Sequence, residues 1–321
     1  MKAIYQLKFG KPDVLQVGEL PLPKIKSNEV LIHNQAASVN PRDCLVRAGK
    51  YQLQFLVKGS PLVLGSDCAG TIVKVGSKVK GFQPGDRVYG MKNPSHGLAT
   101  YAEYVAIAQD HIATLPENIS FIDGASIPLC ALTAWQGLVD QAHLKKDESV
   151  LVIGASGGVG VFATQLANIF GANVTGVCSG DNADLVASLG AHKVINYRET
   201  NLSSLTSQYD VIFDAVGSLK RHQYLGLLNP AGRYVTTLPS IENIQHGLLS
   251  KFKRLFFPRI KQTRVVMVKP NAQQLRYIAE YLAADKLKPV IDSVYECHEA
   301  QAAHTRSQSK RARGKIVIKV L

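Results

Sequence analysis

The sequence contains few cysteines, and none of the five, at positions 44, 68, 130, 178 and 297, lies in a C-x-x-C pair or another metal-binding spacing. We therefore expect neither a disulfide framework nor a structural zinc site, and the expected location is cytoplasmic. No stretch approaches the roughly 20 consecutive apolar residues of a transmembrane helix. Residues Met1–Lys8 alternate like a strand and lack the long apolar segment of a secretory signal. The sequence thus predicts a soluble protein.

Acidic residues are missing from two long basic segments. Overall, 37 Lys and Arg against 24 Asp and Glu give a net charge of +13, but residues 243–279 and 300–321 hold basic residues and no acid. The excess charge is therefore local, and neither a general polyanion-binding surface nor an obligate nucleic-acid partner is expected. Two explanations stay open: an anionic ligand nearby, or weak attraction to an acidic surface such as a membrane.

With 46% hydrophobic residues in a chain of 321, the protein can bury a substantial core, and its length favours two folding units. Up to about Ser120 the apolar residues come in short alternating or β-branched segments separated by turns, which is typical of strands. The clearest of these are Val30–His33, Thr71–Val75 and Tyr101–Ile107. The sequence predicts a mainly β first unit.

From about Asp123 the pattern changes to buried strands that alternate with helices. Val150–Ile153 is a continuous apolar run, suited to a strand covered on both faces. Alternation at this spacing predicts a parallel sheet built of βαβ units. The expected strands are Val150–Ile153, Asn173–Val177, Val194–Tyr197, Val211–Asp214, Arg233–Thr236 and, as the last of the series, Val265–Val268, with helices over 159–170 and 182–189.

The remaining residues are expected to fold back on the first unit. They contain a predicted helix over 273–284 and strands at Val294 and Ile316–Val320. The predicted organisation is a β domain at 1–122, an α/β domain at 123–268 and a returning C-terminal segment at 269–321.

The most informative segment, Leu151–Gly160, joins a predicted strand to an amphipathic helix and carries glycines at 154, 157 and 160. Glycines at this spacing allow a tight turn, a close approach of the backbone to a pyrophosphate, and close packing of the helix on its strand. The helix N-terminus adds N–H donors and the positive end of its dipole. We predict a dinucleotide-binding loop; the alternative is a glycine-rich connection without a ligand. The predicted contacts are Ser156, Gly157, Gly158 and Val159.

The residues after the second predicted strand indicate which dinucleotide binds. NAD-dependent enzymes place Asp or Glu there, where it accepts hydrogen bonds from the ribose hydroxyls. Here the tip is Cys178-Ser179-Gly180, and a hydroxyl admits a 2′-phosphate that a carboxylate would repel. Ser179, with Asn182 and Tyr197 nearby, favours NADPH. Asp181 is evidence against NADPH, but it lies two residues beyond the expected position and is expected at the start of the next helix.

Several further segments match one known pattern over essentially the whole chain. They are Ala37–Asp43, Leu64–Gly70, Pro84–Gly90, Leu132–Trp135, Val194–Tyr197, Asp214–Gly217 and Arg313–Val317, together with the glycine-rich loop. With them the chain resembles the medium-chain dehydrogenase/reductase superfamily and, within it, the zinc-independent quinone oxidoreductase branch that includes the chloroplast-envelope quinone oxidoreductase homologue and the reticulon-interacting mitochondrial protein. The resemblance implies an α/β protein with a GroES-like, mainly β catalytic domain and a Rossmann-type, doubly wound parallel sheet that binds NADP.

The resemblance also implies chemistry without a metal. Zinc-dependent alcohol dehydrogenases of the superfamily place cysteine at the position of Asn40, histidine and glutamate at Ser66-Asp67, and a second cysteine at Leu129. These positions do not supply here the three converging ligands that zinc needs. Cys130 is adjacent to the last of them, but one residue along a helix turns a side chain about 100° away.

Without a Lewis acid, the expected reaction is hydride transfer to an electron-poor quinone or α,β-unsaturated carbonyl, which needs positioning and a hydrogen bond to the developing oxyanion. By resemblance, Asn40 and Tyr51 line the pocket, and Tyr51 is either the proton donor or only a packing aromatic. The resemblance also implies a homodimer formed through the edge of the nucleotide-binding sheet. The residues that it assigns to the cofactor are Thr133, Gly217, Leu238 and Lys315.

One segment supports a different class of function. In residues 247–261, basic and aromatic residues interleave, as they do in interfacial helices and in grooves for single-stranded nucleic acid. The alternative prediction is therefore a peripheral membrane- or nucleic-acid-binding protein with a vestigial cofactor site. A surface helix that packs on the nucleotide domain is favoured instead, because its apolar residues have helical spacing. These residues are Leu248, Leu249, Phe252, Leu255 and Phe256.

Overall fold

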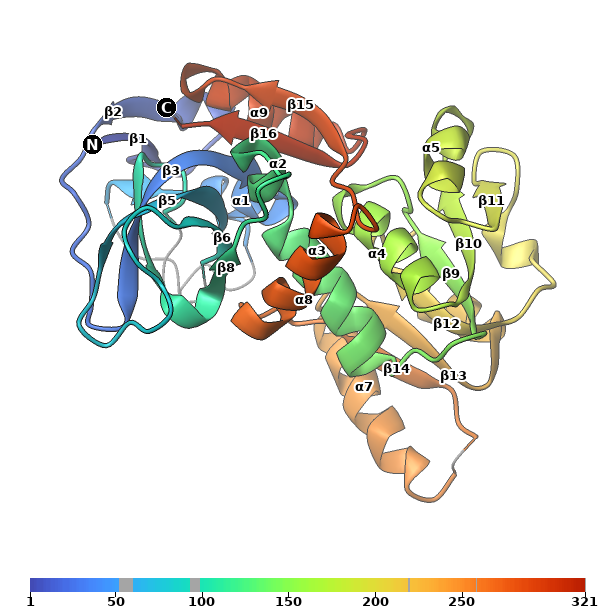
Figure 1. Cartoon of the computed structure of the whole chain (residues 1–321). Helices are drawn as coiled ribbons and strands as arrows, with labels where there is room; N and C mark the ends of the chain where they lie inside the picture. Colours follow the sequence, from blue (N-terminus) through green and yellow to red (C-terminus); the bar gives the residue numbers. More distant parts are fainter. Residues whose placement is uncertain (52–59, 93–98, 219, 258, 321) are drawn as a thin grey trace. The chain divides into compact units, whose positions relative to one another are not determined.

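The computed structural model describes residues 1–51, 60–92, 99–218, 220–257 and 259–320. The chain divides into two compact units: Met1–Leu132 together with Lys269–Leu321, and Thr133–Val268 (Figure 1). We call them unit 1 and unit 2. Within the described ranges, no helix is both long enough and apolar enough to cross a membrane.

Unit 1 is built around the long strand β3 (Glu29–Val39). β3 pairs antiparallel with β5 (Asp67–Val75), β7 (Tyr104–Ala108) and the C-terminal strand β16 (Lys315–Lys319), so the tail does return to the first unit. The sheet runs β15 (Ile291–Tyr295), β16, β3, β5, β6 (Arg87–Met91), β8 (Ile112–Thr114), and a smaller sheet runs β2 (Gln16–Glu19), β1 (Lys2–Gln6), β4 (Leu62–Val63). The mainly β first unit is confirmed. Its helices are α1 (Pro41–Arg47), α2 (Phe121–Ser126), α8 (Ala272–Ala283) and α9 (Ala300–Gln308).

Unit 1 extends ten residues beyond the expected boundary at 122, to Leu132. The reason is the packing of α2 and of the start of α3 (Pro128–Trp135). Gly124 of α2 is buried, and a Cβ on it would lie 2.9 Å from Leu115 and 3.1 Å from Ala69, closer than side chains normally pack. At the start of α3, the Leu129 N–H donates a 2.7 Å hydrogen bond to Asp67 of β5. These helical residues therefore complete the β unit rather than begin the α/β unit.

Unit 2 is a parallel sheet with strand order β11-β10-β9-β12-β13-β14. In chain order this is 3-2-1-4-5-6, the doubly wound order of dinucleotide-binding sheets. Val150, Leu151 and Val152 of β9 are fully buried, as expected for a central strand. The strands are β9 (Ser149–Ile153), β10 (Asn173–Cys178), β11 (Lys193–Asn196), β12 (Tyr209–Asp214), β13 (Leu228–Thr236) and β14 (Gln262–Val265), and the helices are α4 (Gly158–Ile169), α5 (Ala183–Ser188), α6 (Arg221–Gly226) and α7 (Ile241–Arg254).

The last strand of this sheet corrects one prediction. The apolar run Val265–Val268 was the expected strand, whereas β14 covers Gln262–Val265 and begins three residues earlier. Its position is set by pairing with β13, from Arg233 opposite Gln262 to Thr236 opposite Val265. A strand at the end of the strand order has one paired neighbour, so polar residues are tolerated there.

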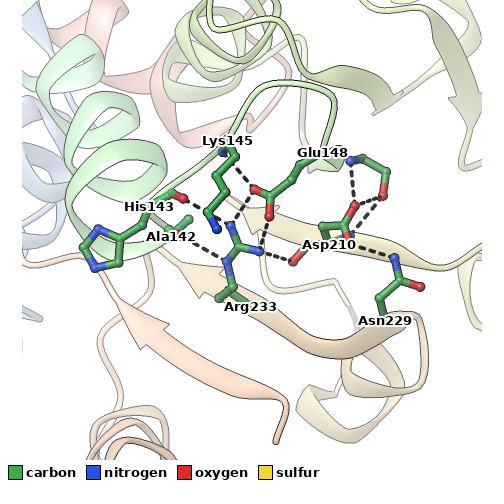
Figure 2. A network of polar contacts seen from close by, with 8 residues as sticks. Ala142, His143, Lys145, Glu148, Asp210, Asn229 and Arg233 are labelled. Atoms are coloured by element: carbon green, nitrogen blue, oxygen red, sulfur yellow. Dashed lines mark hydrogen bonds and ion pairs between the residues drawn. The ribbon is translucent and has the colours of Figure 1, made fainter. Parts of the chain in front are cut away.

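The amino-terminal ends of the unit 2 strands are tied together by polar contacts (Figure 2). The Arg233 guanidinium of β13 contacts both carboxylate oxygens of Glu148 at 2.8 and 2.6 Å and donates to the Ala142 carbonyl. At the start of β12, the Asp210 carboxylate accepts from the Ser149 N–H and hydroxyl and from the Asn229 amide. These contacts fix the starts of β9 and β12 against β13.

α7 corrects a second prediction. Leu248, Leu249, Phe252, Leu255 and Phe256 were expected to pack on the domain, but their exposed fractions are 67, 47, 62, 76 and 66%. The only buried residue of α7 is Ser250, which faces the sheet at Thr263 of β14. The predicted helical spacing of these apolar residues was correct, but the prediction that they pack on the domain was wrong. The helix packs on the sheet through its opposite side, at Ser250. Pro258, within the segment 247–261, lies outside the described residues.

Candidate active site

In unit 2 the glycine-rich loop has the geometry that a pyrophosphate site needs. Gly154 follows β9 with φ of +80°, a conformation that side chains other than glycine rarely adopt. A Cβ on Gly160 would lie 2.0 Å from the Gly154 carbonyl oxygen, so helix and strand can approach this closely only without a side chain. Gly157 caps α4, which begins at Gly158 and Val159. The positive end of the α4 dipole therefore lies at this loop.

The loop and the tip of β10 are joined by one side chain. The Asn182 amide nitrogen donates to the Ser156 hydroxyl at 3.2 Å and to the Ser179 hydroxyl at 3.1 Å. The tip is supported from β11, because the side-chain Oδ1 of Asn196 accepts a hydrogen bond from the Gly180 N–H at 3.0 Å. Three predicted cofactor residues, Ser156, Ser179 and Asn182, are thus in contact with one another at the carboxyl edge of the sheet.

An arginine at the same tip escaped the sequence analysis. Arg198 follows the half-exposed Tyr197, whose N–H bonds to the Cys178 carbonyl. Its guanidinium is 2.8 Å from the Asp181 carboxylate, with both side chains more than half exposed. Asp181 lies in the turn that leads into α5, as expected. The sequence contained a signal for it. Arg198 directly follows Tyr197, and an arginine near this tip can bind a 2′-phosphate.

Further along the carboxyl edge, Gly217 and Leu238 come together. The buried Asp214 carboxylate accepts from the Val216 and Gly217 N–H groups at 2.9 and 2.8 Å and from the Tyr234 hydroxyl, which fixes the turn after β12. Gly217 has φ of +73°, and a Cβ there would lie 2.5 Å from the Leu238 side chain. These ends of β12 and β13 therefore form one small surface. Leu238 itself is 41% exposed.

Thr133, which the resemblance assigned to the cofactor, lies in α3 and is 5% exposed. It is also the first residue of unit 2. The structure leaves its assigned role a prediction.

In unit 1 a buried polar cluster surrounds Asn40, where β3 meets α1. Asn40 Oδ1 accepts a 2.6 Å hydrogen bond from Lys315, and Asn40 Nδ2 donates at 2.9 Å to Asp67. Asp67 Oδ2 also accepts from the Ser38 hydroxyl at 2.6 Å and lies 3.6 Å from the Lys315 ammonium. The sheet register explains the meeting, because Ser38 pairs with Asp67 and the residue after Lys315 pairs with Val39. We call Asn40, Asp67 and Lys315 the Asn40 cluster.

The Asn40 cluster contains charges with almost no access to water. Lys315 and Asp67 are 3% and 0% exposed. Burial alone would lower the pKa of Lys315, but Cys130 and the carboxyls of Asp67 and Asp43 together raise it. Burial raises the pKa of the Asp43 carboxyl to about 6, although that group accepts a hydrogen bond from the Asn40 N–H. Lys315 is therefore a buried cation that depends on Asp67 as its counter-ion.

Lys315 was assigned to the cofactor by resemblance, and the structure places it against the Asn40 side chain. Its ammonium makes the amide oxygen of Asn40 the acceptor, which directs the amide nitrogen toward Asp67. A cation on the carbonyl side also polarises the amide and strengthens its N–H groups as donors. The cluster can thus hold one neutral donor in a fixed orientation beside a buried lysine–carboxylate pair.

Tyr51, the predicted proton donor, is partly buried and packs against the core cluster that includes Cys44 and Leu64. The Arg42 guanidinium lies 4.9 Å from the centre of its ring, a cation–π distance. Both contacts support the alternative that Tyr51 is a packing aromatic, while its role as a donor stays a prediction. The adjacent residues 52–59 lie outside the described residues.

A catalytic zinc needs at least three converging protein ligands. In the described part of the chain, no group of three His, Cys, Asp or Glu side chains is placed to hold a metal. The positions that resemble the zinc ligands carry Asn40, Ser66 and Leu129, and the Asp67 carboxylate between them is already shared by Lys315 and three hydrogen-bond donors. A metal bound to Asp67 would take its counter-ion away from a buried lysine.

Comparison with known proteins gives a consistent picture. Two family models match: an alcohol dehydrogenase GroES-like domain over residues 26–117 and a zinc-binding dehydrogenase over residues 189–318. The chloroplastic quinone-oxidoreductase homolog of spinach (Spinacia oleracea) is 32% identical over 96% of this chain and 95% of its own length. The 2-methylene-furan-3-one reductase of tomato (Solanum lycopersicum) is 34% identical over 99% of this chain and 79% of its own length. Similarity therefore extends over both units.

A solved structure matches equally well. The quinone oxidoreductase of Coxiella burnetii has a TM-score of 0.90 and 33% sequence identity, covering 100% of this chain and 99% of that one. The mainly β unit and the parallel sheet of unit 2 thus correspond to the GroES-like and Rossmann domains that the resemblance implied.

Proposed function

Because this chain belongs to the medium-chain dehydrogenase/reductase superfamily, we propose that it is a zinc-independent reductase that uses NADPH to reduce a quinone or an α,β-unsaturated carbonyl. Membership makes it an oxidoreductase with a nicotinamide cofactor. The choice of NADPH, the acceptor and the independence from zinc are the parts that we propose.

The observation that carries the choice of NADPH is the neutral, hydrogen-bonded tip of β10. Ser179 and Asn182 offer a hydroxyl and an amide where NAD-dependent enzymes have a carboxylate. Arg198 adds a cation at the same tip and forms an ion pair with Asp181. A 2′-phosphate that binds here would take the guanidinium from the Asp181 carboxylate, which is more than half exposed and can be hydrated instead.

When bound, NADPH supplies the hydride. The backbone at Gly157, Gly158 and Val159 would hold its pyrophosphate, and Gly217 and Leu238 would contact it at the ends of β12 and β13. In unit 1, Lys315 and Asp67 hold the Asn40 amide in one orientation. Asn40 is the proposed hydrogen-bond donor to the acceptor oxygen, and the buried Lys315 charge favours the oxyanion that forms there. Tyr51 or water then donates a proton to this oxyanion.

Two features support an electron-poor acceptor. The spinach and Coxiella proteins are named as a quinone oxidoreductase homolog and a quinone oxidoreductase, and the tomato protein as a reductase of a methylene-furanone, whose carbonyl is conjugated with a double bond. The Asn40 cluster offers a hydrogen bond beside a lysine that is paired with a carboxylate, but its described residues lack the donor set for zinc. Such a site favours substrates that need no Lewis acid.

The proposal is tested by the loss of NADPH absorbance with a panel of quinones and enones, with and without a chelator. We expect turnover with at least one member, unchanged by the chelator. The Asn40→Ala variant should lower kcat about a hundredfold while leaving NADPH binding intact. Chelator-sensitive turnover, or wild-type protein that binds NADPH but reduces no member, would refute the proposal.

We further propose a cytoplasmic homodimer. The five cysteines are free thiols, four of them buried, which fits a reducing compartment. β14 ends the strand order of unit 2 and can pair with β14 of a second copy. Sedimentation velocity that reports a monomer at micromolar concentrations would exclude the dimer.

A further inference from the structure

The exposed side of α7 is a continuous apolar stripe that the proposed reaction does not use. Seven side chains along the helix and its last turn are 42–77% exposed. They are Ile241, Ile244, Leu248, Leu249, Phe252, Leu255 and Phe256. At about 100° per residue, all seven fall on one side of the helix, and the buried Ser250 falls on the opposite side. Figure 1 shows α7, in orange, reaching past the end of its sheet.

The opposite side of α7 is firmly attached to unit 2. The Thr263 N–H donates to the Ser250 hydroxyl at 3.2 Å, and Arg254 donates to the Gln262 side chain at 3.1 Å. Phe252 and Phe256 contact each other edge to face, 5.6 Å between ring centres. The stripe is therefore a fixed surface of the domain. Contiguous apolar surface of this extent marks an interaction site.

The charges beside the C-terminal half of the stripe are basic. Lys251 and Lys253 lie on either side of it, and the exposed Arg259 follows in the chain. The only acidic residue of α7 is Glu242, at the far, N-terminal end. An apolar face bordered by lysines is the pattern of a helix that lies in the interface of an anionic bilayer.

We propose that α7 docks on anionic membrane surfaces, with its apolar stripe among the lipid headgroups and Lys251 and Lys253 at the phosphates. A second copy of this chain is disfavoured as the occupant, because a two-fold contact would bring basic border against basic border. A polynucleotide is disfavoured because five of the seven side chains are aliphatic and offer no ring on which a base can stack. This inference does not depend on the cofactor or the acceptor.

The test is sedimentation of the full chain with vesicles of phosphatidylcholine alone and of an equimolar mixture with phosphatidylglycerol. We expect binding to the mixture and little to the neutral vesicles, weakened by added salt. The Phe252→Ser/Leu255→Ser variant should lower the partition coefficient at least about tenfold. Each of Lys251→Gln and Lys253→Gln should lower it about fivefold.

Matched controls lie in unit 1, where Leu22 is a 57% exposed leucine and Lys24 an exposed lysine. Leu22→Ser and Lys24→Gln should bind vesicles like the wild type, and all variants should keep the wild-type circular dichroism spectrum and NADPH affinity. Equal binding to both kinds of vesicle, no binding, or binding unaffected in the double variant would overturn the proposal. So would an oligomer that the Phe252→Ser/Leu255→Ser change dissociates while vesicle binding stays the same.

Discussion

The Asn40 cluster of unit 1 and the cofactor loop of unit 2 are built by different means. In unit 1 the Asn40 cluster consists of side chains, with a buried lysine, a buried carboxylate and an amide held between them. In unit 2 the cofactor loop consists mainly of backbone and small neutral side chains, and its shape depends on Gly154 and Gly160. Electrostatics therefore dominates in the Asn40 cluster and steric fit in the cofactor loop, so the same kind of substitution should have different effects in the two units.

The largest effect is expected from a substitution in the cofactor loop, where steric fit dominates. In Gly160→Val the new side chain would overlap the Gly154 carbonyl, since even a Cβ would lie 2.0 Å from it. We expect a loss of about 4–5 kcal/mol in the free energy of unfolding and no measurable NADPH binding. Urea denaturation and calorimetry measure the two quantities. The matched control is Gly226→Ala in α6, where a Cβ meets nothing within 4 Å; it should change stability by less than about 1 kcal/mol.

The stability of the Asn40 cluster should depend on the charge of Lys315. Lys315→Met has a similar volume but leaves the Asp67 carboxylate buried beside no cation, and we expect a loss of about 3–4 kcal/mol in the free energy of unfolding. Lys319→Met is the control in the same strand, because its pair with Glu296 is about two-fifths exposed and worth at most about 1 kcal/mol. Equal losses in the two variants would mean that burial of the Asn40 cluster has no energetic consequence.

The pH dependence of stability should reveal the same burial. The pKa of Asp43 is raised to about 6 by burial, so the folded protein binds its proton more tightly than the unfolded chain, and this contribution to stability is lost as the pH rises through about 6. In Asp43→Asn that loss is absent. Relative to the wild type, the free energy of unfolding of the variant should rise by about 2 kcal/mol between pH 4 and pH 7.

Asp292 provides a control of opposite sign within unit 1. Hydrogen bonds from Arg306 lower its pKa to about 2, so its contribution is present above the unfolded value and is lost as the pH falls toward 2. Asp292→Asn should therefore lose stability at neutral pH and approach the wild type in acid. Urea midpoints over a pH series distinguish the two slopes; parallel slopes would contradict the burial of Asp43.

The smallest effect is expected at Arg198, the arginine at the β10 tip. Arg198→Gln should weaken NADPH binding about tenfold and leave NADH binding unchanged, because only NADPH carries the 2′-phosphate. Arg276→Gln, an exposed arginine of α8, is the control and should change neither. Equal weakening of both dinucleotides would show that Arg198 acts on the fold of the tip instead of on the phosphate.

Much of the fold was predictable because its signals are local. Continuous apolar runs such as Val150–Ile153 predict buried parallel strands, and the glycine spacing predicts the loop that follows. The strand β14 was misplaced because its position is decided by pairing with β13, and Gln262, Thr263 and Arg264 have little strand character of their own. An edge strand is determined by its neighbour more than by its residues.

The site was predictable to a smaller extent. The contacts among Ser156, Ser179 and Asn182 follow from strand ends that meet at one edge, which the chain order implies. The Asn40 cluster joins residues 275 positions apart through the register of β3, β5 and β16, and no local pattern contains that register. For α7, the helical period shows that an apolar stripe exists, but only the packing shows which side faces the sheet.

The phosphate preference of the β10 tip can be measured by isothermal titration calorimetry of the wild-type protein with NADPH and with NADH. A tip formed by Ser179, Asn182 and Arg198 should bind NADPH about a hundredfold more tightly, and Ser179→Asp should abolish that preference. If the wild type binds NADH as tightly as NADPH, the tip is not a phosphate site and the proposed cofactor is wrong.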